Sequence, residues 1–74
     1  MKPRTGTNVV VLEELPPDAH DWPDHFVHQM RGKLYKVSSD CGLDEIPNSF
    51  FVQRIVGNAM FDVWLLPHWV RVDG

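Results

Sequence analysis

The residues best suited to chemistry gather between positions 20 and 28, where two aspartates lie among three histidines: His20, Asp21, Asp24, His25 and His28. Imidazole and carboxylate groups are ligands that zinc accepts. The spacing of the histidines matches no structural zinc motif, however, and the only cysteine stands in a different segment. We therefore expect no metal site and no cofactor. The cluster is better interpreted as a pH-sensitive surface, because imidazoles among carboxylates titrate near neutrality.

Cys41 is the one residue that suggests covalent catalysis, since a thiol beside an imidazolium becomes a good nucleophile. The sequence offers neither an orienting third group nor an oxyanion hole for such a pair. A chain of this length also rarely buries a substrate pocket on the order of several hundred Å³. We expect no enzymatic activity.

Three tryptophans suggest recognition instead. Trp64 stands in the most apolar segment, which favours a core ring or an outward ring covered by a loop. Trp22 lies among prolines and acids, and Trp69 follows Pro67 and His68. Exposed aromatic rings flanked by charge are typical of binding hot spots, so Trp22 and Trp69 are candidate anchors. The alternative for both is that they cap one end of the fold.

Charge is distributed unevenly along the chain. Residues 13–24 contain five acids and no base, whereas Arg31, Lys33 and Lys36 follow directly. Such an acidic loop could steer a basic partner or imitate a nucleic acid, although the charges could equally serve only to solubilise the loop. The formal net charge of -3 gives no general attraction to phosphate, so nucleic acid is not the expected partner.

Size and composition favour one small folded domain over residues 1–74. With 43% hydrophobic residues the chain can form a core, although a domain of this length buries only about 60% of its unfolded surface. A single cysteine cannot form a disulfide within the chain, which favours an intracellular, cytoplasmic setting. No apolar run approaches the roughly 18 residues of a membrane span, so no membrane partner is expected.

Strand-like patterns recur five times, at residues 8–13, 33–38, 50–56, 59–66 and 70–72. Gly57-Asn58 predicts a tight hairpin between the third and fourth strands, because both residues tolerate the positive φ of primed turns. His68 and Trp69 fit one turn of 3₁₀ helix before the last strand.

Two irregular connections separate the early strands, at residues 15–25 and 39–49. A short helix carrying Phe26 and Met30 follows the first, with Asp21 or Asp24 as its cap and Gly32 just past its end. The alternative is an α+β fold in which residues 21–31 form a full helix across a four-stranded sheet.

The segment Leu65-Leu66-Pro67-His68-Trp69-Val70 resembles the hydrophobic-hydrophobic-Pro-x-x-aromatic-Val segment of SH3 domains, with one residue fewer between the proline and the aromatic. The order of elements is also similar. The resemblance implies an all-β fold, a small five-stranded SH3-like barrel, partly open, with a long acidic first loop. The strand patterns predict a core of Val9, Val11, Val37, Phe51, Ile55, Phe61, Val63, Leu66 and Val70.

In SH3 domains this segment lines a shallow groove together with carboxylates of the first long loop. Here the matching residues are Pro67 and Trp69, with Asp18, Asp21 and Asp24 in the loop. The groove tyrosines and paired tryptophans of the family are replaced by Val10 to Glu14 and by Phe50-Phe51.

These observations predict a non-enzymatic protein-binding module. The predicted contact residues lie in the acidic loop and the carboxyl-terminal turn: Asp18, Asp21, Trp22, Asp24, Pro67 and Trp69. Small chains of this type resemble the regulatory or inhibitory proteins that phages and mobile elements encode. The alternative is an assembly subunit that forms homo-oligomers.

Overall fold

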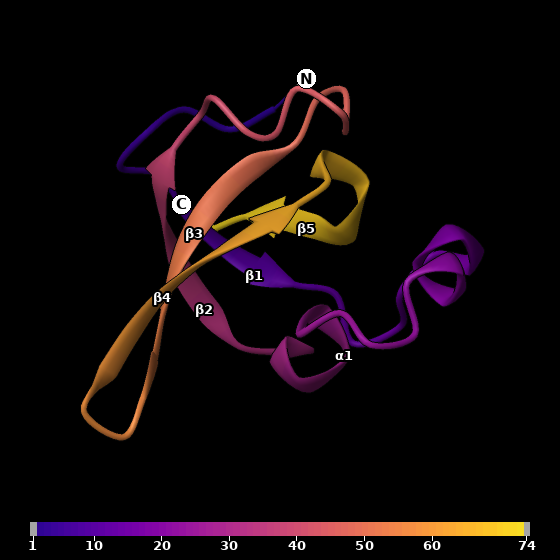
Figure 1. The fold of residues 1–74 in the computed structure, drawn as a ribbon, viewed down its shortest axis with the longest axis horizontal. Coiled ribbons are helices and arrows are strands. Elements are labelled where there is room, and N and C mark those ends of the chain that lie inside the picture. Colours follow the sequence, from indigo (N-terminus) through magenta and orange to yellow (C-terminus); the bar gives the residue numbers. More distant parts are fainter. Residues whose placement is uncertain (1, 74) are drawn as a thin grey trace.

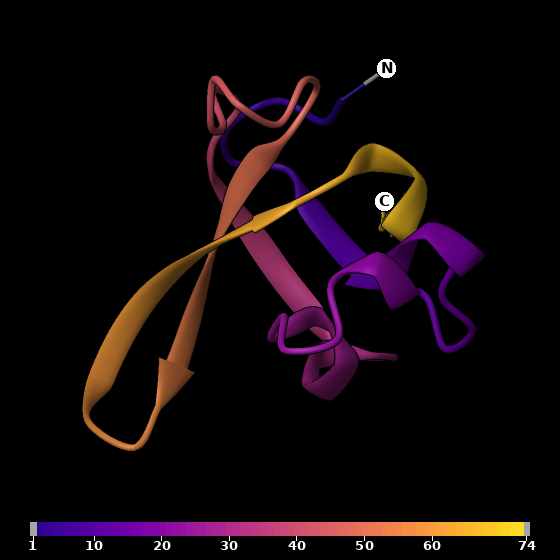
Figure 2. The ribbon, with the colours of Figure 1, turned by 45° about the vertical axis from the view of Figure 1, so that its right-hand side comes forward.

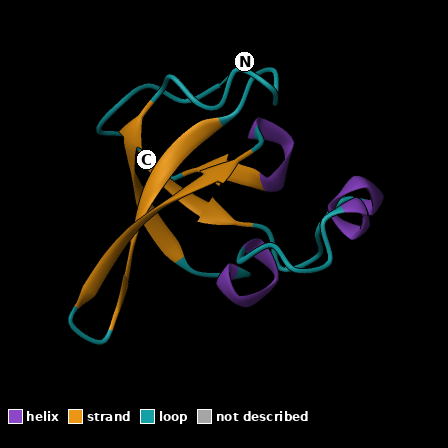
Figure 3. Cartoon of the chain, in the orientation of Figure 1, coloured by secondary structure: helices purple, strands orange, loops and turns teal. Residues whose placement is uncertain are grey.

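The computed structural model describes residues 2–73, which form five strands and three short helical segments (Figures 1 and 3). All five predicted strands are confirmed, with ends shifted by up to two residues. Their bounds are β1 (Asn8–Val11), β2 (Leu34–Ser39), β3 (Phe50–Val56), β4 (Ala59–Leu65) and β5 (Val70–Val72). The helical segments are η1 (Pro17–Asp21), α1 (Val27–Met30) and η2 (Pro67–Trp69). No helix among residues 2–73 is long and apolar enough to cross a membrane.

The strands form one antiparallel sheet in the order β4-β3-β2-β1-β5. β2 pairs with β1 through residues 34–36 and with β3 through residues 37–39. The register shifts between Val37 and Ser39, an irregularity of the kind that lets one strand bend and twist strongly. β4 and β5 are the two edges, and no strand pairing among residues 2–73 joins them. The predicted five strands are therefore present, but the sheet is not closed into a barrel.

The tight hairpin predicted at Gly57-Asn58 is confirmed. It joins β3 and β4 in a register that runs from Val56 opposite Ala59 to Phe50 opposite Leu65. Gly57 has a φ of +61°, a backbone conformation that a residue with a side chain adopts only with strain. Asn58, in contrast, does not have a positive φ. Glycine at the first central position is the pattern of a type II′ turn. The hairpin extends well beyond the rest of the sheet (Figures 1 and 2).

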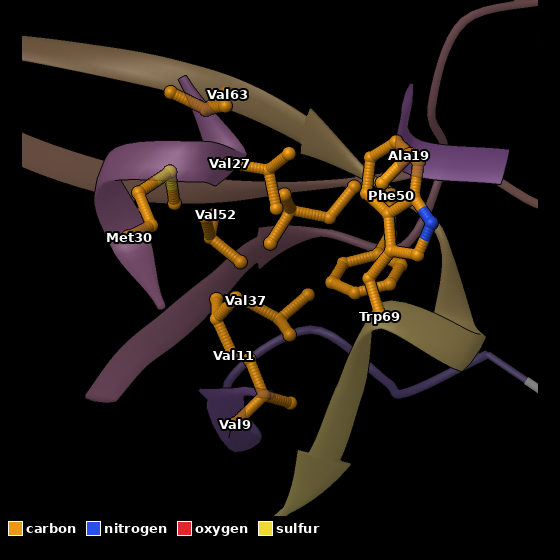
Figure 4. Packing of buried hydrophobic residues seen from close by; sticks show 11 residues of the cluster. Val9, Val11, Ala19, Val27, Met30, Val37, Phe50, Val52, Val63 and Trp69 are labelled. Carbon is orange, nitrogen blue, oxygen red and sulfur yellow. The ribbon is translucent and has the colours of Figure 1, made fainter. Parts of the chain in front are cut away.

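Side chains from the strands and all three helical segments meet in one hydrophobic cluster (Figure 4). Val9, Val11, Val37 and Val63 are buried in it, as predicted. Leu66 and Val70 are half-buried and pack against it. The full buried set is Val9, Val11, Ala19, Val27, Met30, Val37, Phe50, Val52, Val63, Leu65 and Trp69.

The core prediction is wrong for the central hairpin. In β3 the buried residues are Phe50 and Val52, so the inward face is one residue out of step with the predicted Phe51 and Ile55. Phe51 is half-buried and Ile55 is exposed. Phe61 shares the inward face, but it is exposed because the hairpin there has passed beyond the body of the sheet.

The first long connection contains both the unpredicted η1 and the predicted short helix α1. The N-cap residue is Phe26, so the prediction that Asp21 or Asp24 caps the helix is wrong. The backbone N–H of Val27 donates instead to Nδ1 of His25 at 2.8 Å. Gly32 follows the helix with a φ of +74°, as predicted. The alternative full helix over residues 21–31 is wrong, because the α-helix contains only Val27–Met30.

Candidate functional site

One carboxylate joins the acidic loop to the carboxyl-terminal turn across fifty residues of sequence. Nε2 of His68 donates to Oδ2 of Asp18 at 2.6 Å, and the indole N–H of Trp69 donates to Oδ1 at 3.4 Å. Asp18 lies in η1, whereas His68 and Trp69 lie in η2. The two segments that the sequence analysis placed in one site are therefore in direct contact.

A cluster of aromatic rings packs next to this junction. Trp64, on β4, lies edge-on to Trp22 with ring centroids 5.0 Å apart, and the ring of His25 lies 4.3 Å from it at 89°. Trp69 completes the cluster, 5.5 Å from Trp64. The loop thus covers Trp64, which is one of the two placements that the sequence left open for that ring.

Hydrogen bonds to main-chain groups hold the loop in place over the cluster. Nε2 of His28 lies 3.2 Å from the carbonyl oxygen of Ala19 and 3.0 Å from that of Trp22. Both partners only accept, so Nε2 carries a proton and donates to them. Ala19 itself is fully buried. The loop is therefore preorganised rather than left free to adopt its shape on binding.

His25 occupies a less polar place than the other histidines. Its Nδ1 accepts from the backbone N–H of Val27, which puts the proton of the neutral ring on Nε2, a buried atom without a hydrogen-bond partner. Desolvation lowers the pKa of His25, and the charge of His28 lowers it further, while the main chain of Trp64 partly offsets both. The ring is therefore held neutral more firmly than an exposed histidine.

Asp18 is the best-connected acid of the loop. Its slight desolvation raises the pKa of the carboxyl, but the hydrogen bonds from His68 and Trp69 and the charge of His68 outweigh that effect and lower it. Asp18 and His68 make the one salt bridge within the described residues 2–73. Asp21 and Asp24 are exposed, so their carboxylates face solvent.

The predicted contact residues divide into an exposed group and a buried one. Trp22 remains 38% exposed and Pro67 is half-buried, so both can meet a partner. Trp69 is fully buried beside Phe50 and Ala19 (Figure 4), so the expectation that its ring is exposed is wrong. The 3₁₀ turn of η2 points the ring of Trp69 into the core, and the indole N–H of Trp69 donates from there to Asp18.

An open depression of about 500 Å³ adjoins the carboxyl-terminal turn. It lies between η2 and the connection from β2 to β3, and it is lined by Lys2, Pro47, Asn48, Leu66, Pro67 and His68. We use the term acidic aromatic face for surface residues of η1, of the loop that follows it and of η2: Asp18, Asp21, Trp22, Asp24, Pro67 and His68.

The histidines do not converge on a metal position. His20 is exposed on η1, while His25 and His28 are engaged as described above. Within residues 2–73 no three His, Cys, Asp or Glu side chains come close enough together to hold an ion. The exposed Cys41 makes its contacts within its own loop, where its backbone N–H bonds Ser39 and its thiol bonds Asp40.

Sequence reasoning missed His68 as the partner of Asp18 and His25 as part of the aromatic cluster. Neither pairing has a local signal, because the partners lie 50 and 39 positions apart. Comparisons with protein-family models, curated proteins and solved structures found no match.

Proposed function

We propose that this chain is a small protein-binding module that occupies a basic surface of a partner protein through the acidic aromatic face. The observation that carries the proposal is the bridge from Asp18 to His68 and Trp69, which builds one face from two distant segments. The module acts by occupying that surface, in the manner of an inhibitor or regulator, and not by chemistry.

The same proposal assigns the fold to the SH3-like class, in a partly open form. Two observations support this assignment: β2 is shared between β1 and β3, and the short 3₁₀ segment η2 leads directly into the last strand. Pro67 opens η2 and Trp69 closes it, in the same order as in the SH3 segment, although the ring of Trp69 is buried and does not line a groove.

The anchor of the face is Trp22. Its ring is partly exposed and braced edge-on against Trp64, so a partner could cover it without first having to order it. A ring held this way is typical of hot spots, where truncation to alanine costs about 2 kcal/mol or more of binding. Pro67 and the ring of His68 add contact area beside it.

The carboxylates of Asp21 and Asp24 supply charge around this anchor. They are exposed and carry no ion pair within residues 2–73, so their field is available to a lysine- or arginine-rich surface. Rim charges of this kind act mainly on the association rate and its dependence on salt. An acidic face of this kind also competes with nucleic acid for a basic protein.

A quantitative pull-down from cell lysate tests the proposal. The bait proteins are the wild type, Trp22→Ala and Leu34→Ala, where Leu34 is a matched exposed apolar residue on β2, outside the acidic aromatic face. We expect a partner that Leu34→Ala retains and Trp22→Ala loses. A partner bound equally by all three folded proteins would overturn the proposed face.

A further inference from the structure

The free end of the hairpin, residues 54–61, carries apolar side chains on both of its faces. Ile55 and Met60 face each other across the pair on one side and are 69% and 62% exposed. Val56 and Phe61 lie on the other side and are 48% and 45% exposed. We call this segment the hairpin arm. Exposed apolar groups gathered on one projecting element are unusual in a monomer and mark an interaction surface.

The arm also offers an unpaired strand edge. β4 is an outer strand of the sheet, paired only with β3. The two-residue turn closes on the pair of Val56 and Ala59, so alternate residues from Ala59 onward bond to β3. The backbone N–H and C=O groups of Met60 and Asp62 therefore point away from the sheet, ready to pair with another strand.

Edge strands usually carry charged residues, proline or a bulge that prevents pairing with another chain, and the β4 edge has few such features. Asp62 is the only charged residue of β4, and its carboxylate accepts from the hydroxyl of Ser38 at 3.2 Å, which draws it back across the sheet. Arg54, the only charged residue of the arm, is held by Phe26 and Gln29, with its guanidinium 4.9 Å from the phenyl centroid.

We propose that the hairpin arm is a self-association surface, on which the β4 strand of a second copy pairs antiparallel with this β4 about a twofold axis near Phe61. The two sheets then join edge to edge, and Met60 of each copy covers the other arm. In this register Met60 lies opposite Asp62 of the second copy, so the two carboxylates are not directly opposed. Such an interface is isologous, with one patch meeting itself.

The low charge of the arm favours contact with a second copy there. The chain as a whole carries a formal charge of -3, which opposes close contact between copies. The arm has no acid and its one base is already engaged. Asp62, the one acid that the pairing adds, lies opposite Met60 of the second copy, and its carboxylate accepts from Ser38, so repulsion between the copies is weak there. One short strand pair lies at the small end of protein interfaces, and we expect a dimer with a dissociation constant in the micromolar range.

The arm lies away from η1 and η2 in both views of the ribbon (Figures 1 and 2), so the proposal does not depend on the acidic aromatic face. A dimer built this way leaves both of those faces open. It would double the number of partner sites in one particle, and avidity would follow if the partner presents its basic surface more than once.

Sedimentation velocity from low micromolar to near-millimolar concentration tests the proposal. The wild type should pass from monomer to dimer. Met60→Glu should remain monomeric, because it places an acid directly opposite Asp62 of the second copy, whereas Leu34→Glu, an equal change on β2, should still dimerise. Both positions are exposed, so both variants should keep the wild-type circular dichroism spectrum and melting temperature.

Amide exchange of the full chain provides a second readout that reports on the edge itself. The amides of Met60 and Asp62 should exchange fast in dilute protein and more slowly as the concentration rises. A wild type that stays monomeric at every concentration would overturn the proposal. So would a dimer that persists in Met60→Glu, a dimer in which these two amides stay unprotected, or protection obtained only with a different protein.

Discussion

The indole N–H of Trp69 donates to the carboxylate of Asp18 at 3.4 Å, so a fully buried core residue holds the acidic loop in position. The same carboxylate accepts from His68 at the surface. The junction between η1 and η2 is therefore both part of the core and the support of the acidic aromatic face. Substitutions on its two sides should have different effects.

On the buried side, Trp69→Ala should strongly destabilise the fold and not merely weaken binding. Removing a fully buried tryptophan costs about 3 to 5 kcal/mol, and small domains have only about 5 kcal/mol or slightly more to lose. Urea denaturation followed by circular dichroism measures the loss. Trp22→Ala is the matched control, because Trp22 is partly exposed and should cost much less. Equal stabilities for the two variants would contradict the burial of Trp69.

At the surface, the carboxyl of Asp18 should titrate below its ordinary pKa of 3.8. Desolvation raises this pKa, but the hydrogen bonds from His68 and Trp69 and the charge of His68 together outweigh it. The folded pKa is lowered, so the stability that it contributes is present above pH 3.8 and is lost as the pH falls through the folded value. Carboxyl NMR titration measures this pKa directly. His68→Ala should move it upward, and an unchanged value would argue against the ion pair.

His25 should make the fold sensitive to mild acid. Its pKa is lowered from 6.5, mainly by desolvation, so the unfolded chain binds the proton more tightly than the folded one. The contribution is complete above pH 6.5 and is lost as the pH falls below it toward the folded value. Protonation of Nδ1 also removes the acceptor for the backbone N–H of Val27.

Urea midpoints measured above and well below pH 6.5 test this acid sensitivity. The wild type should lose stability across that interval, and His25→Gln should lose less. His20→Gln, a change at an exposed histidine, is the control and should behave as the wild type does. The same pH dependence in all three proteins would show that His25 is not responsible.

The hairpin turn allows a paired test of backbone geometry. Gly57→Ala should destabilise the protein by about 1 to 2 kcal/mol, because φ at this position is +61°. Asn58→Ala should have little effect, because Asn58 does not adopt the positive region. Thermal denaturation of both variants separates them, and the reverse order of stability would contradict the type II′ turn.

The strands could be predicted from sequence because β-branched runs and turn residues are local signals. The inward face of β3 could not, since Phe50, Phe51 and Val52 are all apolar and only tertiary packing decides between them. The burial of Trp69 also depends on a long-range contact, because the short η2 turn carries the ring into the core beneath η1.

The contact between the acidic loop and the carboxyl-terminal turn could be predicted for a different reason, while their role as a binding site stays a prediction. Residue types can be read from the sequence without knowing the tertiary structure. This holds for the proline, aspartate and tryptophan residues of the long loop and for the segment from Pro67 to Trp69. Which of those side chains face a partner depends on how η1 and η2 meet. His68, which no local pattern distinguished, is at the centre of that contact.

Chemical-shift mapping of the isotope-labelled chain, titrated with the partner captured by the wild type, measures the binding face most directly. The largest shifts should fall on the indole of Trp22, the amides of Asp21 and Asp24, and the ring of His68, and they should shrink as salt is added. Leu34 should be unaffected. Shifts confined to the hairpin arm or to the basic segment around Arg31 and Lys33, with Trp22 unchanged, would contradict binding through the acidic aromatic face.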